Sequence, residues 1–166
     1  MLEQLPVIIE PLRLAEAGRQ LHGRLPLAGL SRLAPALHEV QGEVEVELDL
    51  GKDELRIAYV RGRLRAQLNL ICQRCLQPMV LPVDAEFALG LVTSEEAAEQ
   101  LPTHYEPLLV SGPVQLAEII EDELILAVPF VPLHPMGQCP AQSGQQGRDE
   151  GKPPHPFAAL AQLKRP

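Results

Sequence analysis

The sequence predicts an α+β fold: an antiparallel β-meander sheet with one principal helix, short accessory helices and a candidate structural metal clip. Three observations predict it. Apolar and polar residues alternate with a period of two through several segments between positions 40 and 91, which is typical of half-buried strands. One segment near position 120 has instead the 3.6-residue apolar period of an amphipathic helix. Three cysteines and one histidine have the residue types and spacing of metal ligands.

The first predicted strand runs from Val40 to Leu50. Its apolar residues hold even positions and its acidic residues odd positions, so one face is expected in the core and the other is acidic. The apolar set is Val44, Val46, Leu48 and Leu50, and the acidic set is Glu43, Glu45, Glu47 and Asp49. A turn at residues 51–53 leads into a second, short strand over residues 55–59, in which Leu55, Ile57 and Tyr59 are in phase.

A third strand is expected after Gly62, and a fourth from Met79 to Leu91. In the third strand, Leu64, Ala66, Leu68, Leu70 and Cys72 alternate with Arg63, Arg65, Gln67 and Asn69. Only short segments join the strands. Because parallel neighbours would need long crossovers, these short connections favour an antiparallel meander.

The principal helix is predicted from Val114 to Val128, and Pro129 ends it. Its apolar stripe consists of Leu116, Ile119, Ile120, Leu124 and Ala127. Two short accessory helices are expected, one from Gly29 to Leu37 and one capped by Ser94.

The division of the chain is expected to follow its composition. Residues 1–139 contain the α+β domain and its clip, and residues 140–156 are rich in Gly, Gln, Pro and Ser, as in a flexible linker. Residues 157–166 form a short amphipathic segment. Because an isolated helix of this length is marginal in water, the segment needs a surface to fold on, either the parent domain or a partner.

Neither export nor membrane insertion is indicated. The first residues lack the basic and apolar regions of a secretory signal, and the apolar run from Leu124 to Leu133 is short and interrupted by prolines. We expect a soluble, cytoplasmic protein with no membrane partner.

The net charge of −8 conceals two regions of opposite sign. Residues 51–75 are locally basic, whereas residues 84–123 contain acidic side chains but no Lys or Arg. Arginines of the basic region are candidate contacts to RNA phosphates. They are Arg61, Arg63, Arg65 and Arg74. The alternative is that the strand arginines pair with the acidic side chains of the first strand across the sheet.

The acidic side chains of the principal helix are candidate contacts to a basic protein partner. They are Glu118, Glu121, Asp122 and Glu123. The alternative is an ordinary solvated helix face, which is common for runs of charge.

A metal site is predicted from four soft donors. Cys72 and Cys75 are separated by two residues, His134 follows after fifty-eight more, and Cys139 after a further four. Three thiolates and an imidazole can close a tetrahedral site, and Zn²⁺ is the usual structural ion for such a set. Two alternatives are half-buried cysteines with an unrelated loop histidine, and a cysteine redox sensor.

No catalytic pattern is present. The sequence lacks a phosphate loop and a Ser-His-Asp set, and its histidines are scattered. Four protein ligands would also leave a metal no open coordination position. We therefore expect a non-enzymatic protein with no small-molecule substrate.

Three segments resemble the bacterial YceD family. They are CQRCLQPM at residues 72–79, the run from Glu118 to Cys139 that begins EIIEDELILAVP, and PFAALAQLK at residues 156–164. The likeness lies in the order and spacing of these motifs and covers nearly the whole chain. The matched positions are Cys72, Arg74, Cys75, Glu121, Asp122, Glu123, Pro129, His134 and Cys139.

The resemblance implies a non-enzymatic factor needed for the synthesis, processing or accumulation of 23S ribosomal RNA, and hence for biogenesis of the large ribosomal subunit. The family is also associated with the gene for a large-subunit ribosomal protein. Two mechanisms are considered: binding of 23S rRNA or its precursor by the arginines, and an acidic chaperone that holds a basic large-subunit ribosomal protein. The cysteine redox sensor is the remote third alternative.

Overall fold

The computed structural model describes residues 4–139. The strands are β1 (Ile8–Ile9), β2 (Gln20–Pro26), β3 (Glu43–Lys52), β4 (Ala58–Ile71), β5 (Pro78–Val92), β6 (Glu106–Leu109) and β7 (Val114–Gln115). The helices are α1 (Pro11–Glu16), α2 (Glu95–Glu99) and α3 (Leu116–Ala127), with 3₁₀ turns η1 (Leu27–Gly29) and η2 (Ala34–Ala36). The predicted linker 140–156 and terminal segment 157–166 lie outside the described residues.

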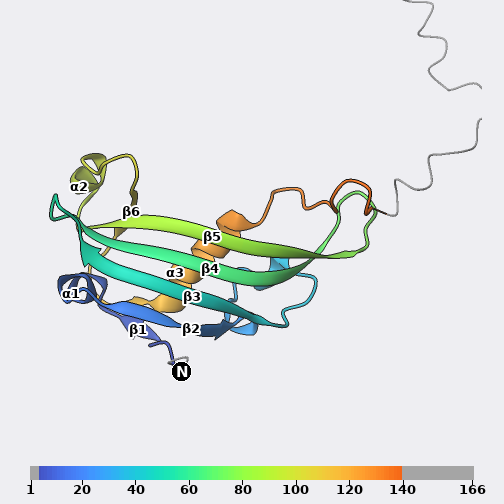
Figure 1. Cartoon of the computed structure of the whole chain (residues 1–166), viewed down its shortest axis with the longest axis horizontal. Helices are drawn as coiled ribbons and strands as arrows, with labels where there is room; N and C mark the ends of the chain where they lie inside the picture. Colours follow the sequence, from blue (N-terminus) through green and yellow to red (C-terminus); the bar gives the residue numbers. More distant parts are fainter. Residues whose placement is uncertain (1–3, 140–166) are drawn as a thin grey trace, which may run out of the picture.

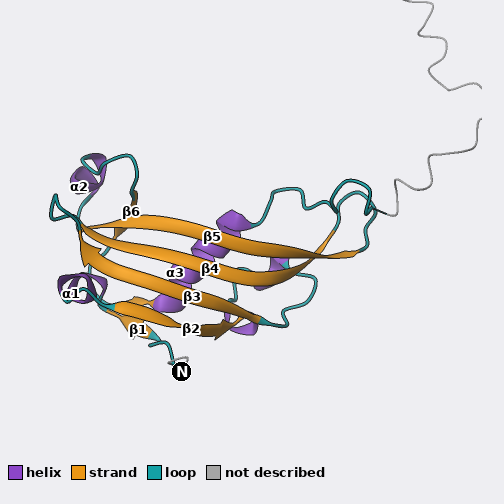
Figure 2. Cartoon of the chain, in the orientation of Figure 1, coloured by secondary structure: helices purple, strands orange, loops and turns teal. Residues whose placement is uncertain are grey.

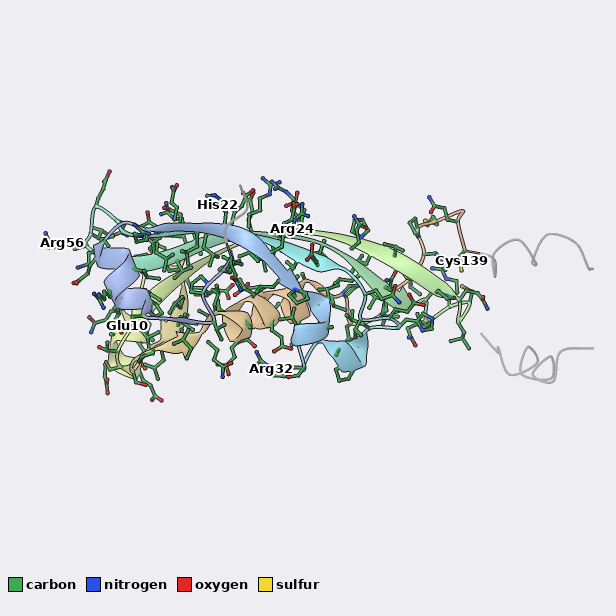
Figure 3. The ribbon with its side chains drawn as sticks, turned by 90° about the horizontal axis from the view of Figure 1, so that it is seen from below. Glu10, His22, Arg24, Arg32, Arg56 and Cys139 are labelled. Atoms are coloured by element: carbon green, nitrogen blue, oxygen red, sulfur yellow. The ribbon has the colours of Figure 1, made fainter. Side chains whose placement is uncertain are left out.

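The five-stranded sheet has the order β2-β3-β4-β5-β6, with consecutive strands side by side (Figure 1). Pairs from β2 to β5 are antiparallel, and β6 is parallel to the end of β5. The helix α3 lies against one face of the sheet, and β1 pairs with β7 beside it (Figure 2). Figure 3 shows the strands arched over α3. The predicted α+β fold with an antiparallel meander is therefore confirmed.

The core lies between α3 and the inner face of the sheet. The even-numbered apolar residues of β3, from Val44 to Leu50, are at most 3% exposed. On α3, Leu116, Ile120 and Leu124 are buried against them, as the 3.6-residue period predicts. Burial of apolar surface on both elements is the main stabilising contribution to this layer.

The structure has one long strand where the sequence predicted two with a break at Gly62. The residues of β4 pair continuously with β5, from Tyr59 opposite Gly90 to Ile71 opposite Pro78. Gly62 interrupts the apolar pattern but not the strand, because the side chains of Phe87 and Leu48 fill the space that its missing side chain leaves on the inner face. Tyr59 consequently lies on the outer face, in phase with the arginines.

The helix predicted from Gly29 to Leu37 is wrong. Two 3₁₀ turns occupy residues 27–29 and 34–36 instead, and the leucines at positions 27, 30 and 33 are at most 1% exposed. Of these leucines only Leu27 lies within a 3₁₀ turn, and Pro35 lacks the N–H that a continuing helix would need. The helix capped by Ser94 is confirmed as α2, with the Ala97 N–H donating to the Ser94 hydroxyl oxygen.

No helix within residues 4–139 combines the length and the apolar character that crossing a membrane would require.

Gly62→Ala is expected to lower the free energy of unfolding by about 1–3 kcal/mol, because an added methyl group would overlap the Phe87 ring and lie 2.8 Å from Leu48. Chemical denaturation measures this effect. Gly112→Ala is the matched control, since an added carbon there has no atom within 4 Å. Equal stability of the two variants would mean that Phe87 moves aside without cost.

Candidate metal centre and charged surfaces

The connection between β4 and β5 is a tight turn that holds Cys72 and Cys75. The Cys72 N–H donates to the Gln77 carbonyl at 3.0 Å, and the Leu76 N–H donates to the Cys72 carbonyl at 2.8 Å. Leu76 adopts a left-handed backbone with φ of 58°. The turn therefore folds back on itself and places both sulfurs at the end of the long hairpin.

The chain that follows α3 lies against this turn. The Gln73 N–H donates to the Pro132 carbonyl at 2.9 Å, and the His134 N–H donates to the Cys72 sulfur at 3.4 Å. A second turn, closed by the Gln138 N–H and the Pro135 carbonyl at 3.1 Å, brings in Cys139. Cys139 is 3% exposed, although the five residues before it are more open.

The structure brings the four predicted donors together. The ligand atoms of Cys72, Cys75, His134 and Cys139 all lie within 4.8 Å of one another, and all three cysteines are free. We call this group the clip. Three sulfurs and one ring nitrogen at such separations can hold a metal ion in tetrahedral geometry. The clip joins the end of α3 to the β4–β5 hairpin.

The orientation of His134 suits metal binding by Nδ1. Its Nε2 lies 3.2 Å from the Pro78 carbonyl oxygen, and Nδ1 lies 3.3 Å from the Cys75 sulfur. Because a carbonyl oxygen only accepts, Nε2 carries the proton in the neutral ring and Nδ1 is left with a lone pair toward the sulfurs. A backbone carbonyl behind a ligating histidine is a common second partner that fixes the ring.

The two cysteines of the turn differ in acidity. Burial disfavours the Cys72 thiolate, but backbone N–H donors of His134, Cys75 and Arg74 outweigh it and lower the pKa of Cys72 to about 5. Burial raises the pKa of Cys75, and the neighbouring Cys139 and Cys72 sulfurs add to this effect. The backbone donors therefore favour the thiolate form of Cys72, which is the form that binds a cation.

The strand arginines lie on the outer face of the sheet, where Arg63 and Arg65 pair with carboxylates. Arg63 donates to both oxygens of Asp84, at 2.7 and 2.6 Å, and lies 3.2 Å from Glu86. Arg65 lies 3.1 Å from Glu47. The predicted pairing with β3 occurs for Arg65 but not for Arg63. The register places Arg63 between Glu47 of β3 and Glu86 of β5, and its ion pairs go to the β5 carboxylates Asp84 and Glu86. The Arg63 guanidinium lowers the pKa of Asp84.

Arg61 is held by aromatic rings instead. Its guanidinium carbon lies 4.4 Å from the centre of the Tyr59 ring, and it donates to the Tyr105 hydroxyl at 3.1 Å. Arg74 is different, because it lies exposed in the turn of the clip and has no ion pair with any side chain of residues 4–139. Of the four predicted RNA contacts, Arg74 is the one whose charge is most available.

The predicted acidic contacts on α3 divide into two groups. Glu121 has a side chain that is only 6% exposed, and it accepts from the Arg32 Nε at 3.0 Å and the Leu33 N–H at 3.0 Å. Asp122 pairs with Arg32 at 2.6 Å. These two carboxylates hold the 3₁₀ segment on α3. Sequence reasoning missed Arg32, because its partners lie about ninety residues away.

Glu118 and Glu123 are less engaged. Glu118 is exposed, and its backbone carbonyl accepts from Arg32 at 3.0 Å. Burial raises the pKa of Glu123, and the nearby Glu106 and Asp122 add to the effect. Glu118 is thus exposed and Glu123 half-buried, and within residues 4–139 neither carboxylate forms an ion pair.

Comparison with a family model and with known proteins gives the same family name. The model of the family described as "Large ribosomal RNA subunit accumulation protein YceD" matches residues 60–164. A protein of that name from Haemophilus influenzae is 32% identical over 168 residues, which cover 97% of each chain. No solved structure matches.

Glu121→Gln is expected to lower the free energy of unfolding at pH 7 by roughly 2–4 kcal/mol, because it removes the charge that Arg32 and two backbone N–H groups face. Chemical denaturation measures the loss. Glu99→Gln is the control, since Glu99 is exposed, and it should change stability by less than about 0.5 kcal/mol.

The effect of Glu121 should depend on pH. Burial opposes its charge, but the Leu33 N–H and the Arg32 groups outweigh it and lower its pKa in the folded chain. Its contribution is therefore complete above the unfolded value of about 4.3 and is lost as pH falls through the folded pKa. The stabilities of wild type and Glu121→Gln should converge below about pH 4. A gap that stays constant into acid would contradict this assignment.

Proposed function

Because the chain belongs to the YceD family, we propose that it is a non-enzymatic factor that supports accumulation of large-subunit ribosomal RNA by binding 23S rRNA or its precursor. The observation that carries the proposal is the relative that matches along 97% of both chains and bears the corresponding name. A cytoplasmic location is part of the proposal, since bacterial ribosomes are assembled there.

The non-enzymatic part of the proposal is supported by the clip. All four side chains that converge there are good metal ligands, and a tetrahedral ion held by them has no position left for water or substrate. The clip therefore suits a structural ion that fixes the hairpin end. It has no feature of an open hydrolytic centre.

For the RNA contact we propose that Arg74 acts together with the arginines of the outer sheet face. Arg74 lies on a turn held by backbone hydrogen bonds, so its charge is presented from a rigid base. Arg61, Arg63 and Arg65 would have to exchange tyrosine or carboxylate partners for phosphates. An isolated exposed ion pair contributes only about 0–1 kcal/mol, so the pair of Arg65 with Glu47 is exchanged at little cost. Arg63 costs more to release, because it binds Asp84 through two hydrogen bonds.

A specific observation favours the second mechanism, in which a basic large-subunit ribosomal protein is bound. On the outer face, the acidic side chains outnumber the arginines. The acidic set is Glu43, Glu45, Glu47, Asp49, Asp84 and Glu86, and the basic set is Arg24, Arg61, Arg63 and Arg65. A hollow of about 1010 Å³ lies over the middle of this face. Net negative potential there attracts a basic chain more readily than RNA.

Crosslinking in cells, with RNA and protein recovered from the same sample, tests the two mechanisms. We expect discrete peaks in 23S precursor RNA that weaken in Arg74→Gln and in the double variant Arg63→Gln, Arg65→Gln. In vitro, each lost phosphate contact should reduce the slope of log affinity against log salt by about 0.7–0.9. Arg56→Gln is the control, since Arg56 is exposed on the turn at the other end of β4.

Background RNA together with one enriched basic ribosomal protein would contradict direct RNA binding and favour the chaperone mechanism. In that case Glu43→Gln and Glu86→Gln on the outer face should reduce recovery of the protein. A loss of recovery in Glu118→Gln and Glu123→Gln instead would assign the contact to α3. The redox alternative requires metal-free cysteines that react readily with a thiol reagent.

For the clip we propose a structural Zn²⁺ ion. The purified chain should contain one zinc ion per molecule by elemental analysis. Cys75→Ser or Cys139→Ser should lower this zinc content well below one ion per molecule. Removal of the ion by a chelator should lower the thermal midpoint, because the loop after α3 would lose its attachment to the hairpin. His104→Gln, a change outside the clip, should keep full zinc content. A metal-free chain as stable as the loaded one would refute a structural role.

A further inference from the structure

Large apolar side chains are exposed on the turn of the clip and along the chain that leads to the clip from the end of α3. Phe130 is 102% exposed, Met136 88%, Leu126 72% and Leu76 68%. Val131 and Leu133 are exposed as well. We call these six residues the apolar end surface. Clusters of this kind on a soluble domain usually mark a place where something binds.

Backbone contacts hold the loop part of the apolar end surface against the hairpin turn, and Leu126 lies in the last turn of α3, from which this loop departs. The hydrogen bond from Gln73 to Pro132 places the loop 130–136 against the turn that carries Leu76. The contact of His134 Nε2 with the Pro78 carbonyl at 3.2 Å fixes the loop a second time. Figure 1 shows this loop running from the end of α3 to the end of the β4–β5 hairpin, away from α1 and α2.

The loop 130–136 has little freedom to turn its exposed apolar side chains toward the core. Prolines at positions 129, 132 and 135 restrict its backbone, and His134 and Cys139 are engaged in the clip. Phe130 and Met136 therefore remain exposed in a segment that is otherwise tied down. This arrangement favours a docking surface over a loosely packed loop.

An apolar segment near the end of the same chain could cover this surface. Phe157, Leu160 and Leu163 recur at three-residue intervals in the terminal segment, which lies outside the described residues. The described chain stops at Cys139, inside the clip, so only the seventeen residues 140–156 separate the two. A linker of that length has a root-mean-square span of about 20–25 Å if it behaves as a flexible coil. The effective concentration of the segment at the surface is then on the order of millimolar.

Two further observations favour the chain's own segment over another partner. The family model matches as far as residue 164, so the sequence shared by the family includes the segment as well as the clip. Lys164 and Arg165 follow the apolar residues of the segment. On α3, Glu123 lies about one helical turn before Leu126, and its pKa is raised by burial and by the nearby Glu106 and Asp122. The positive charges of Lys164 and Arg165 would be attracted to the carboxylates near Glu123.

We propose that residues 157–163 dock on the apolar end surface of the same chain through Phe157, Leu160 and Leu163, with Lys164 and Arg165 toward Glu123 of α3. The occupant is thus a segment tethered to the clip itself, and the contact covers the side chains that the loop leaves exposed. This inference does not rest on the proposed function, since neither RNA nor a ribosomal protein takes part in the contact.

The chain contains no tryptophan, so Phe157→Trp introduces a single fluorescent reporter. In the full-length chain we expect its emission to be blue-shifted and protected from a soluble quencher. Adding Phe130→Ser and Met136→Ser should return both properties to those of a water-exposed tryptophan. These two residues are exposed, so the double change leaves the core intact. Leu55→Ser is the matched control, since Leu55 is 71% exposed at the opposite end of β4.

Three outcomes would overturn the proposal. The tryptophan could be water-exposed in the unaltered background, or buried but insensitive to Phe130→Ser and Met136→Ser. The blue shift could also disappear on dilution, which would mean that the segment docks on a second copy. Because the measurement uses the isolated chain, its failure leaves the crosslinking test of RNA binding unaffected.

Discussion

The antiparallel pairing of β4 with β5 is the constraint on which the rest of the structure depends. Its register runs without interruption from Tyr59 opposite Gly90 to Ile71 opposite Pro78. One end of this hairpin places the two cysteines of the clip, and its middle places Arg63 beside Asp84. A slip of one residue would exchange the two faces, so the apolar core would also be lost.

The helix α3 is attached to the rest of the fold in two chemically different ways. At the 3₁₀ segment, Glu121 accepts hydrogen bonds from Arg32 and Leu33, so a buried carboxylate links two parts of the chain far apart in sequence. After its last turn, the chain reaches the clip and meets Cys72 through His134. The proposed ion would make the second attachment as firm as the first, and both fix the exposed loop between them.

The charges of the outer face show why a local count of arginines is a poor guide to binding. The basic stretch of the sequence suggests a positive stripe, but folding surrounds it with carboxylates from β3 and β5. Arg74 escapes this neutralisation because it lies in a turn beyond the paired strands. The charge available to a partner is therefore decided by register and by position in the sheet.

The sequence by itself determined the alternating strands, the amphipathic α3 and the four donors of the clip, because each depends on short periods or on rare ligand types. Only the tertiary structure decided the rest. Gly62 does not end a strand, because Phe87 and Leu48 from neighbouring strands fill its place. Likewise, Glu121 is a structural carboxylate because Arg32, far away in sequence, reaches it. Such outcomes depend on contacts between distant residues, which local periodicity cannot specify.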